Sequence, residues 1–315
     1  MIFSLNEFLR SNKCFKLICG AGNYDISSVE KLVYLYSKAG CNLFDISADI
    51  DIINAAKSGL KKAGIVENRF LCVSVGLSGD YHFNKYLINQ NKCNKCGICS
   101  KVCLENAIEN FSIDEKKCIG CGKCFEICKN NAFLKTPFFA DIKQILPLLN
   151  NLNIDCIELH SSNSNNQDTF NIWKYISENY KGVLSFCIDR LNYGNNSLIK
   201  RTKKMLSIRK PYTTIIQTDG SPISGGINDY QSTLQAVALS DIILKEKLPA
   251  YVIASGGTNE KTFELAHQCN IDINGVAVGS YARYIVKDYL SGKMDFDTAL
   301  NIASKLVNSI KMRNS

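Results

Sequence analysis

The stretch KCNKCGICSKVCLENAIENFSIDEKKCIGCGKCFEICK, residues 92–129, contains the most specific pattern in the chain. The spacing C-x2-C-x2-C-x3-C occurs in it twice, and the second copy begins 25 residues after the first. The first copy comprises Cys93, Cys96, Cys99 and Cys103, and the second comprises Cys118, Cys121, Cys124 and Cys128. Eight of the fifteen cysteines therefore belong to one repeated pattern of metal-ligand type.

This spacing is typical of bacterial ferredoxins with two [4Fe–4S] clusters, in which three thiolates of one run and the fourth of the other hold each cluster. The crossed pattern predicts two ligand sets, namely Cys93, Cys96 and Cys99 with Cys128, and Cys118, Cys121 and Cys124 with Cys103. Zinc binding by the same thiolates is the alternative, although zinc sites rarely use a repeated triplet with a distant fourth ligand. Leu104 and Lys129 replace the proline that usually follows the fourth cysteine, which affects the loop more than the ligation.

Outside this stretch, short β-like runs alternate with segments of helical periodicity. The expected strands are 15–20, 42–48, 70–76, 154–161, 182–189, 213–219, 250–256 and 275–280. The expected helices are 26–39, 52–63, 138–149, 170–179, 196–208, 230–248, 260–268 and 297–311. Strands joined by helix-length crossovers imply a parallel sheet, and eight such units predict a (β/α)8 barrel of the TIM type. An open doubly wound sheet is the alternative, because the strand count alone does not prove closure.

The cysteine-rich stretch interrupts the alternation after the third expected strand. We therefore predict the first part of the barrel in residues 1–84, a two-cluster ferredoxin-like insert in 85–136, and the rest of the barrel in 137–315. A loop that follows a barrel strand emerges on the face where barrel active sites lie. The clusters are accordingly expected beside the barrel mouth.

The composition is that of a globular protein, with 46% hydrophobic and 21% charged residues. No apolar run approaches the roughly 18 residues that a membrane span requires, and the N-terminal stretch lacks the apolar core of a secretory signal. We expect a soluble, cytoplasmic protein, in which a reducing environment keeps the thiols free. Seven further cysteines lie mostly in apolar runs and are interpreted as small buried hydrophobes: Cys14, Cys19, Cys41, Cys72, Cys156, Cys187 and Cys269.

The formal net charge of +8 falls to about +4 when two oxidised clusters of about −2 each are included. Lysines inside the insert are interpreted as partners for that charge: Lys92, Lys95, Lys101, Lys116, Lys117, Lys123 and Lys129. A short basic run at 200–204 is flanked by apolar residues at helical spacing. This pattern favours the solvated face of an amphipathic helix over a nucleic-acid site.

Two glycine-containing segments follow the seventh and eighth expected strands. Barrel loops at this place often bind phosphate through backbone N–H groups, so the segments predict a phosphorylated ligand or a flavin. The candidate cofactor-binding residues are Gly256, Gly257, Gly279, Ser280 and Arg283. Ordinary turn chemistry is the alternative interpretation.

Polar residues mark several expected strand ends: Lys16, Asp45, Asp49, Ser74, Glu158, His160, Asp189, Arg190, Gln217 and Asp219. No pairing among them defines a mechanism, so the catalytic residues are unknown at this level. Lys16 is either a partner for a flavin or phosphate or a member of an interior ion pair, and His160 is a candidate acid or base. His82 and His267 are expected in a loop and a helix, and the glycine-rich segment 221–228 in a ligand loop or a flexible connection.

The order of these parts resembles one known family. FKLICGAG at 15–22, FDISADIDIINAAKSGL at 44–60, the double cysteine insert and the barrel-like C-terminal half are similar to the cyanobacterial light-dependent period protein family (LdpA). The resemblance covers nearly the whole chain and implies an iron–sulfur protein that conveys cellular redox state, and thereby light, to the circadian clock. Its partners would be clock or other regulatory proteins, or redox partners. The cluster ligands carry over to the eight cysteines, and no catalytic residue does.

Three functions remain compatible with the sequence. The resemblance favours a redox-sensing regulatory protein. Physical chemistry alone slightly favours a ferredoxin-coupled oxidoreductase of the iron–sulfur flavin type, with its ligand at the barrel mouth. A plain electron carrier is the third, and it leaves the barrel unexplained.

Overall fold

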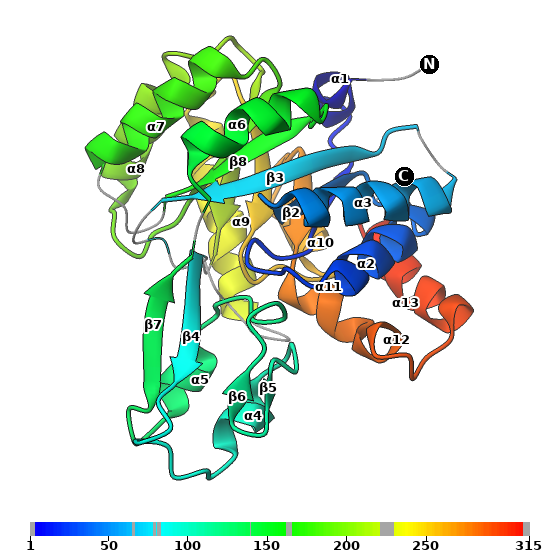
Figure 1. Cartoon of the computed structure of the whole chain (residues 1–315). Helices are drawn as coiled ribbons and strands as arrows, with labels where there is room; N and C mark the ends of the chain where they lie inside the picture. Colours follow the sequence, from blue (N-terminus) through cyan, green and yellow to red (C-terminus); the bar gives the residue numbers. More distant parts are fainter. Residues whose placement is uncertain are drawn as a thin grey trace.

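The computed structural model describes residues 4–64, 67–77, 80, 83–138, 140–161, 166–220 and 230–310. Eight parallel strands form a closed barrel (Figure 1). In barrel order they are β1 (Cys14–Ile18), β2 (Leu43–Ser47), β3 (Phe70–Gly76), β8 (Cys156–His160), β9 (Val183–Ile188), β10 (Thr214–Asp219), β11 (Tyr251–Ser255) and β12 (Gly275–Val278). Because β12 pairs back with β1, the predicted (β/α)8 barrel is confirmed and the open sheet is wrong.

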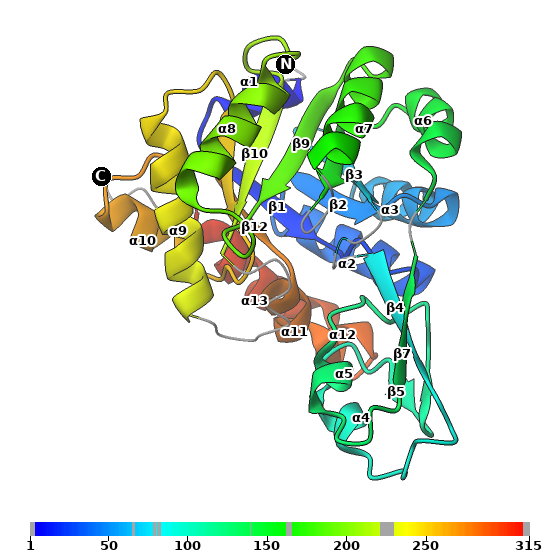
Figure 2. The ribbon, with the colours of Figure 1, turned by 90° about the vertical axis from the view of Figure 1, so that its left-hand side faces the viewer.

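Helices surround the barrel (Figure 2). The long ones are α2 (Ile26–Lys38), α3 (Ile50–Ala63), α6 (Ile142–Asn151), α7 (Asn166–Asn179), α8 (Asn195–Leu206), α9 (Tyr230–Lys245), α10 (Thr262–Gln268) and α13 (Phe296–Asn308). Aspartate side chains cap several of these helices by accepting hydrogen bonds from backbone N–H groups, as Asp25 does for α2 and Asp295 for α13. Asp141 caps α6 in the same way, so that helix begins at Ile142 and the expected start at 138 is wrong.

Alternate residues of each strand face opposite sides of the barrel wall. The outward set packs under the helices in one large core, which includes Phe15, Phe44 and Phe186. The inward set is apolar at the end where the strands begin, with Leu43, Cys156 and Ile253 among its members. The short helix α1 (Leu5–Leu9) packs Leu5 and Leu9 into this second cluster, so it covers that end of the barrel.

The insert leaves the barrel after β3 and returns before β8. Its stem is an antiparallel pair, β4 (Asn84–Ile88) and β7 (Phe133–Pro137), which extends away from the barrel in both ribbon views. Between these strands lie α4 (Ile98–Val102), the small pair β5 (Ile108–Glu109) and β6 (Ser112–Ile113), and α5 (Lys123–Ile127). A ferredoxin-like insert after the third barrel strand is therefore confirmed.

Two further short helices were not expected from the sequence. They are α11 (Ser280–Ile285) and α12 (Lys287–Leu290), which follow β12 and lie beside the insert in Figure 1. The basic run at 200–204 falls in α8, which buries Leu198, Met205 and Leu206, so the predicted amphipathic helix is confirmed. In the described part of the chain, no helix is both long and apolar enough to cross a membrane.

Candidate metal centre and barrel interior

Four cysteines line one pocket at the outer end of the insert. They are Cys93, Cys96, Cys99 and Cys128, so the fourth comes from the second run. The pocket, of about 160 Å³, is otherwise bounded by insert residues such as Ile98, Phe133 and Lys129. We call these four cysteines the outer set. Four thiols around one cavity are the donor set that a [4Fe–4S] cluster requires.

A second pocket is lined by Cys103, Cys118, Cys121 and Cys124, which we call the inner set. Here the fourth cysteine comes from the first run, so the two pockets follow the crossed pattern expected from the spacing. All eight thiols are free of disulfides. The inner pocket also contacts Ser280 of α11, which belongs to the barrel. The inner set therefore lies against the barrel, whereas the outer pocket is built from the insert.

The two halves of the insert repeat the same backbone geometry. Gly97 and Gly122 precede α4 and α5 with φ of 74° and 79°, values that glycine adopts without strain. Backbone N–H groups of Ala107 and Ala132 donate to the sulfurs of Cys103 and Cys128, at 3.3 and 3.5 Å. Such N–H···S bonds balance thiolate charge, so both fourth cysteines sit in surroundings that suit a cluster ligand.

Lys85 of β4 fastens the insert to the barrel. Its Nζ donates to the carbonyl oxygens of Gly22 and Glu115, both at 2.6 Å, and to that of Cys118. The ammonium also lies over the ring of Tyr24, 5.1 Å from its centroid. The side chain is buried, so one cation links the inner cysteine set to the loop after β1.

An ion pair forms a second link between insert and barrel. Arg283 of α11 donates through Nε and Nη2 to Oε1 of Glu105, at 3.0 and 2.8 Å, and through Nη1 to the carbonyl of Ile18 at 2.9 Å. Arg283 is only 5% exposed, and Glu105 lies in the loop after Cys103. Arg283, which the sequence predicted as a donor to an anionic ligand, thus already binds the carboxylate of Glu105 in the insert.

The other predicted ligand residues lie at the ends of β11 and β12. Gly256 and Gly257 have positive φ, and a Cβ on Gly257 would overlap Ser232 of α9, so packing alone accounts for glycine there. Gly279 precedes α11, and Ser280 borders both the inner cysteine pocket and a polar pocket beside it. A phosphate or flavin at these segments stays a prediction.

The polar pocket lies at the junction of insert and barrel and has a volume of about 290 Å³. The barrel contributes Ser280, Arg283 and Lys287, and the insert contributes Glu105 and Lys117. The pocket therefore combines charges of both signs directly beside the inner set.

Inside the barrel, the polar strand-end residues form one buried network. Lys16 Nζ lies 2.9 Å from Asp45 and 2.8 Å from Oε1 of Gln217, and it also pairs with Glu158. Burial would lower the pKa of Lys16, but the two carboxylates hold that pKa well above its usual range. Lys16 is therefore a charged member of an interior ion pair, which is one of the two roles expected for it.

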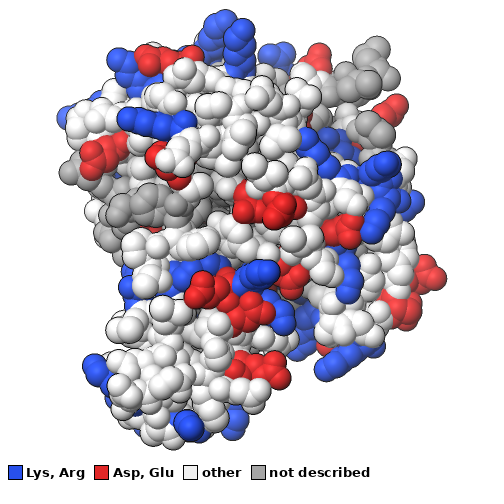
Figure 3. Space-filling model, in the orientation of Figure 1, with Lys and Arg blue, Asp and Glu red and all other residues white. Residues whose placement is uncertain are grey.

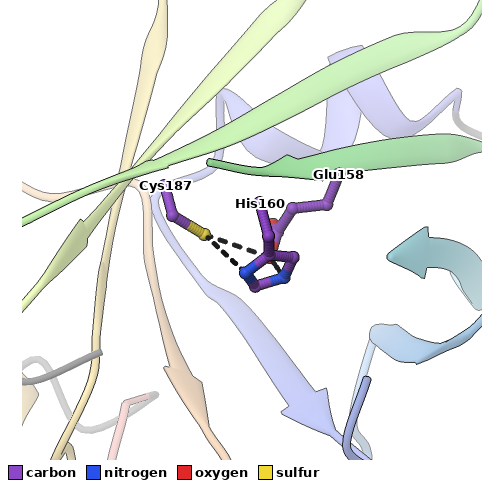
Figure 4. Close-up of side chains that lie close together, drawn as sticks. All are labelled: Glu158, His160 and Cys187. Carbon is purple, nitrogen blue, oxygen red and sulfur yellow. Dashed lines mark hydrogen bonds and ion pairs between the residues drawn. The ribbon is translucent and has the colours of Figure 1, made fainter. Parts of the chain in front are cut away.

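His160 extends this network toward the mouth. Its Nε2 lies 3.1 Å from Glu158 and its Nδ1 lies 3.6 Å from Sγ of Cys187 (Figure 4). Burial would lower the pKa of His160, but the hydrogen bond and charge of Glu158 outweigh burial and raise it to about 9. Phe83, at the start of the insert, packs its ring 5.7 Å from the imidazole and faces Gly76. The histidine is thus a buried, positively charged group beneath an aromatic side chain.

Glu158, His160 and Cys187 also offer three possible metal-ligand atoms within 4.8 Å of one another. Hydrogen-bond donors of neighbouring side chains already occupy the carboxylate of Glu158 and the sulfur of Cys187. Nε2 of Gln217 donates to the carboxylate at 3.2 Å and to the sulfur at 3.3 Å, and Ser185 donates to the same carboxylate at 2.6 Å. A cation would have to displace these donors, so the group fits an internal hydrogen-bond network better than a metal site.

Ser74 also belongs to the network, because its hydroxyl donates to Oδ1 of Asp45 at 2.5 Å and lies 3.2 Å from Nε2 of His160. The other strand-end residues have different surroundings. Asp49 caps α3, Asp189 accepts the backbone N–H of Leu191, Arg190 is exposed, and Asp219 is buried at the end of β10. His267 lies in α10, whereas His82 and the segment 221–228 are outside the described residues.

Sequence reasoning missed several residues that build these sites. Cys187 is buried as expected, but its neighbours are polar, and Cys269 is exposed at the end of α10, so its interpretation as a buried hydrophobe is wrong. No sequence motif pointed to Lys85, Phe83 or Glu105. Their roles depend on contacts between insert and barrel, for which a single sequence provides no signal.

The barrel resembles known structures in fold alone. The tryptophan synthase alpha chain from Legionella pneumophila subsp. pneumophila matches with a TM-score of 0.50 and 12% identity, covering 98% of this chain and 97% of that one. For 2-keto-3-deoxy-6-phospho-gluconate aldolase from Zymomonas mobilis the TM-score is 0.49 and the identity 10%, covering 97% of each chain. At such identities the likeness carries no inference about ligands or activity.

Sequence comparisons identify both parts of the chain. A family model described as 4Fe-4S binding domain matches residues 111–134, which include the second cysteine run, so the chain contains a 4Fe-4S binding domain. The protein Light dependent period A of Synechococcus elongatus is 28% identical over 289 residues, which are 88% of this chain and 82% of that protein. The model of the Light dependent period A C-terminal domain matches residues 148–311, just over half of the chain, from the end of α6 to the end of α13. The chain therefore belongs to the light dependent period A family.

Proposed function

We propose that this protein is a redox-sensing regulatory protein that holds two [4Fe–4S] clusters and conveys light-dependent cellular redox state to the circadian clock. The observation that carries the proposal is the pair of crossed cysteine pockets, of which the inner one shares Ser280 with the barrel. The name of the Synechococcus relative supports the link to light and period. The partners in this proposal are clock proteins or other regulatory proteins.

The contacts at the junction suggest how the barrel would respond. When bound, the clusters supply one-electron oxidation and reduction. Lys85 donates to the carbonyl of Cys118, and Glu105, two residues after Cys103, holds Arg283 of the barrel. A change of charge at the inner set would alter the electrostatic attraction felt by both cations, and hence the surface around α11 and the loop after β1.

Hydrogen–deuterium exchange under anaerobic conditions tests this proposal. The reduced and oxidised holoproteins should differ in amide exchange over residues 19–24 and 280–291, which border the inner set. The double variant Cys96→Ser/Cys121→Ser should lose the absorbance of both clusters and abolish this difference. Cys269→Ser, which removes an exposed cysteine outside both sets, should retain it. Identical exchange in the two redox states of the holoprotein would contradict the proposal.

The polar pocket supports a second candidate, an oxidoreductase that passes electrons from the insert to a bound flavin or phosphorylated ligand. Its 290 Å³ cavity lies directly beside the inner set and includes Ser280 and Arg283, two of the predicted ligand residues. Gentle anaerobic purification followed by cofactor extraction distinguishes the candidates. A stoichiometric flavin would favour the enzyme, whereas a preparation with iron and no flavin or nucleotide would count against it.

A further inference from the structure

The outer set reaches solvent at the end of the insert remote from the barrel. Cys96 is the exposed member of the eight cysteines, and the described residues that line the outer pocket all belong to the insert. Figure 1 draws α4 at this end, whereas the stem strands β4 and β7 lead back to the barrel. A partner can therefore approach the outer set without touching the barrel.

Large apolar side chains surround this approach. Ile98 on α4 and Phe125 and Ile127 on α5 are 40%, 44% and 45% exposed. Ile98 and Ile127 also border the outer pocket itself, and the two helices pack against each other. Single exposed apolar side chains are common on protein surfaces, but a group of them on a small unit usually marks an interaction surface.

Positive charge rings the same side chains. Lys92, Lys101 and Lys129 are exposed and adjoin or flank cysteines of the outer set, and the structure shows no ion pair for them within its described ranges. Glu126 is the one acidic residue on α4 or α5. Figure 3 shows uncharged and basic side chains at this end of the insert, with acidic ones on that face nearer the barrel. These lysines can balance cluster charge and still present their ammonium groups to solvent.

We propose that this tip face, formed by Lys92, Lys101, Lys129, Ile98, Phe125 and Ile127, docks a small acidic protein that carries one electron. The inference rests on the proposed function, because it names the partner class that delivers redox state to the clusters. An apolar centre ringed by unpaired cations complements an apolar patch ringed by carboxylates. Nucleic acid, the other common anionic partner, would gain little from isoleucines at the centre of the contact.

The small size of the tip face suits a transient complex. Electron-transfer encounters bury less area than stable complexes, below about 1,200 Å², and rely on electrostatic steering for a fast association. In the transfer itself the reduced carrier loses one electron and is oxidised, and the cluster held by the outer set gains that electron and is reduced. No bond is formed or broken.

A charge-reversal experiment on the anaerobic holoprotein tests the proposal, with a plant-type [2Fe–2S] ferredoxin as the acidic probe. Binding of the oxidised probe is measured by calorimetry and electron transfer from the reduced probe by stopped-flow spectroscopy, each at low and high salt. The test variant is Lys92→Glu/Lys101→Glu/Lys129→Glu. Lys61→Glu/Lys181→Glu/Lys210→Glu is the matched control. It makes the same charge change at exposed positions in the last turn of α3 and just before β9 and β10, at the opposite end of the barrel.

We expect the tip variant to weaken binding and slow electron transfer by at least about tenfold at low salt, with a smaller effect at high salt because ions screen the attraction. The control should stay within about twofold of the unaltered protein. Iron content and direct reduction by dithionite should be the same in all proteins, which shows that the clusters are intact. Should charge reversal impair folding, the neutral Lys→Gln triple replaces it, with a smaller loss expected.

Equal binding and transfer rates for the tip and control variants would overturn the proposal, and so would duplex DNA binding through these lysines without binding of the carrier. This experiment and the exchange experiment distinguish failure of the docking proposal from failure of the proposed function. If exchange at the junction still depends on redox state while the tip variant behaves as the control does, the docking proposal fails and the redox-sensing proposal stands. If exchange does not depend on redox state, the sensing proposal fails whatever the tip variant does.

Discussion

Lys16 is the cation that pairs with two carboxyl groups buried inside the barrel. Its ammonium pairs with both Asp45 and Glu158, and all three side chains are at most 2% exposed. Lys16→Met would leave two buried carboxylates with His160 as the remaining cation beside them, at a cost of about 3–5 kcal/mol in the free energy of unfolding. Urea denaturation measures this loss. The exposed Lys61→Met serves as control, and a loss for Lys16→Met no larger than the control's would contradict the ion-pair assignment.

Protonation of His160 should make the stability of the fold depend on pH, in a direction that follows from the pKa of the imidazole. Its folded-state pKa of about 9 exceeds the ordinary value of 6.5, so the protonated form stabilises the fold. This contribution is fully present below pH 6.5 and is lost as the pH rises through 9, with a total of about 3 kcal/mol. Unfolding free energies of the holoprotein at several pH values should fall over this window. In His160→Gln that fall should be smaller, and parallel profiles would refute the assignment.

Their positions at expected strand ends marked these polar side chains as candidate site residues of a barrel. Those positions did not predict which of them would pair. Lys16 had two possible roles, and the choice between them depended on Glu158 and Gln217, which lie on strands more than 140 residues away in sequence. A single sequence holds no record of such long-range contacts.

Among the structural elements, the loop between Cys118 and Cys121 allows a matched test of backbone geometry. Gly97 and Gly120 share a φ of 74°, but a Cβ on Gly97 meets no atom, whereas a Cβ on Gly120 would overlap the carbonyl oxygen of Asn84. Gly97→Ala should cost about 1 kcal/mol for the left-handed backbone alone. Gly120→Ala should cost about 1–3 kcal/mol more and lower the iron content per chain. Equal losses in the two variants would show that contact with β4 does not hold this loop.

Strands and long helices were predictable because each spans enough residues to show a period. All eight barrel strands appear within a few residues of their expected positions. The short helices α1, α11 and α12 have four to six residues, too few for a periodic signal. They form because the barrel supplies surfaces for them, as the apolar end of the barrel does for Leu5 and Leu9.

For the whole molecule, the Arg283–Glu105 pair joins elements that are 178 residues apart and couples the insert to the barrel. A double-mutant cycle with Glu105→Gln and Arg283→Met should give a coupling energy of about 1–3 kcal/mol, because both groups are largely buried. Unfolding monitored by circular dichroism supplies the four free energies. Effects that add to within about 0.5 kcal/mol would mean that the pair does not connect the two parts.

The position of the insert after the third strand could be predicted, because it follows from the order of strands and cysteines. Its attachment to the barrel could not. Lys85, Glu105 and Arg283 are charged residues of the kind that usually lie in solvent, and only the folded chain brings them to the junction. The crossed cysteine sets were predictable, since the spacing itself encodes them.

The central claim is that one chain holds two [4Fe–4S] clusters in crossed cysteine sets. Iron and acid-labile sulfide analysis of anaerobically reconstituted protein, with electron paramagnetic resonance of the reduced form, tests it most directly. We predict about eight irons and eight sulfides per chain and interacting signals from two reduced clusters. Cys103→Ser and Cys128→Ser should each leave about four irons, with signals from different clusters. Four irons or fewer in the unaltered protein, or zinc in their place, would contradict the claim.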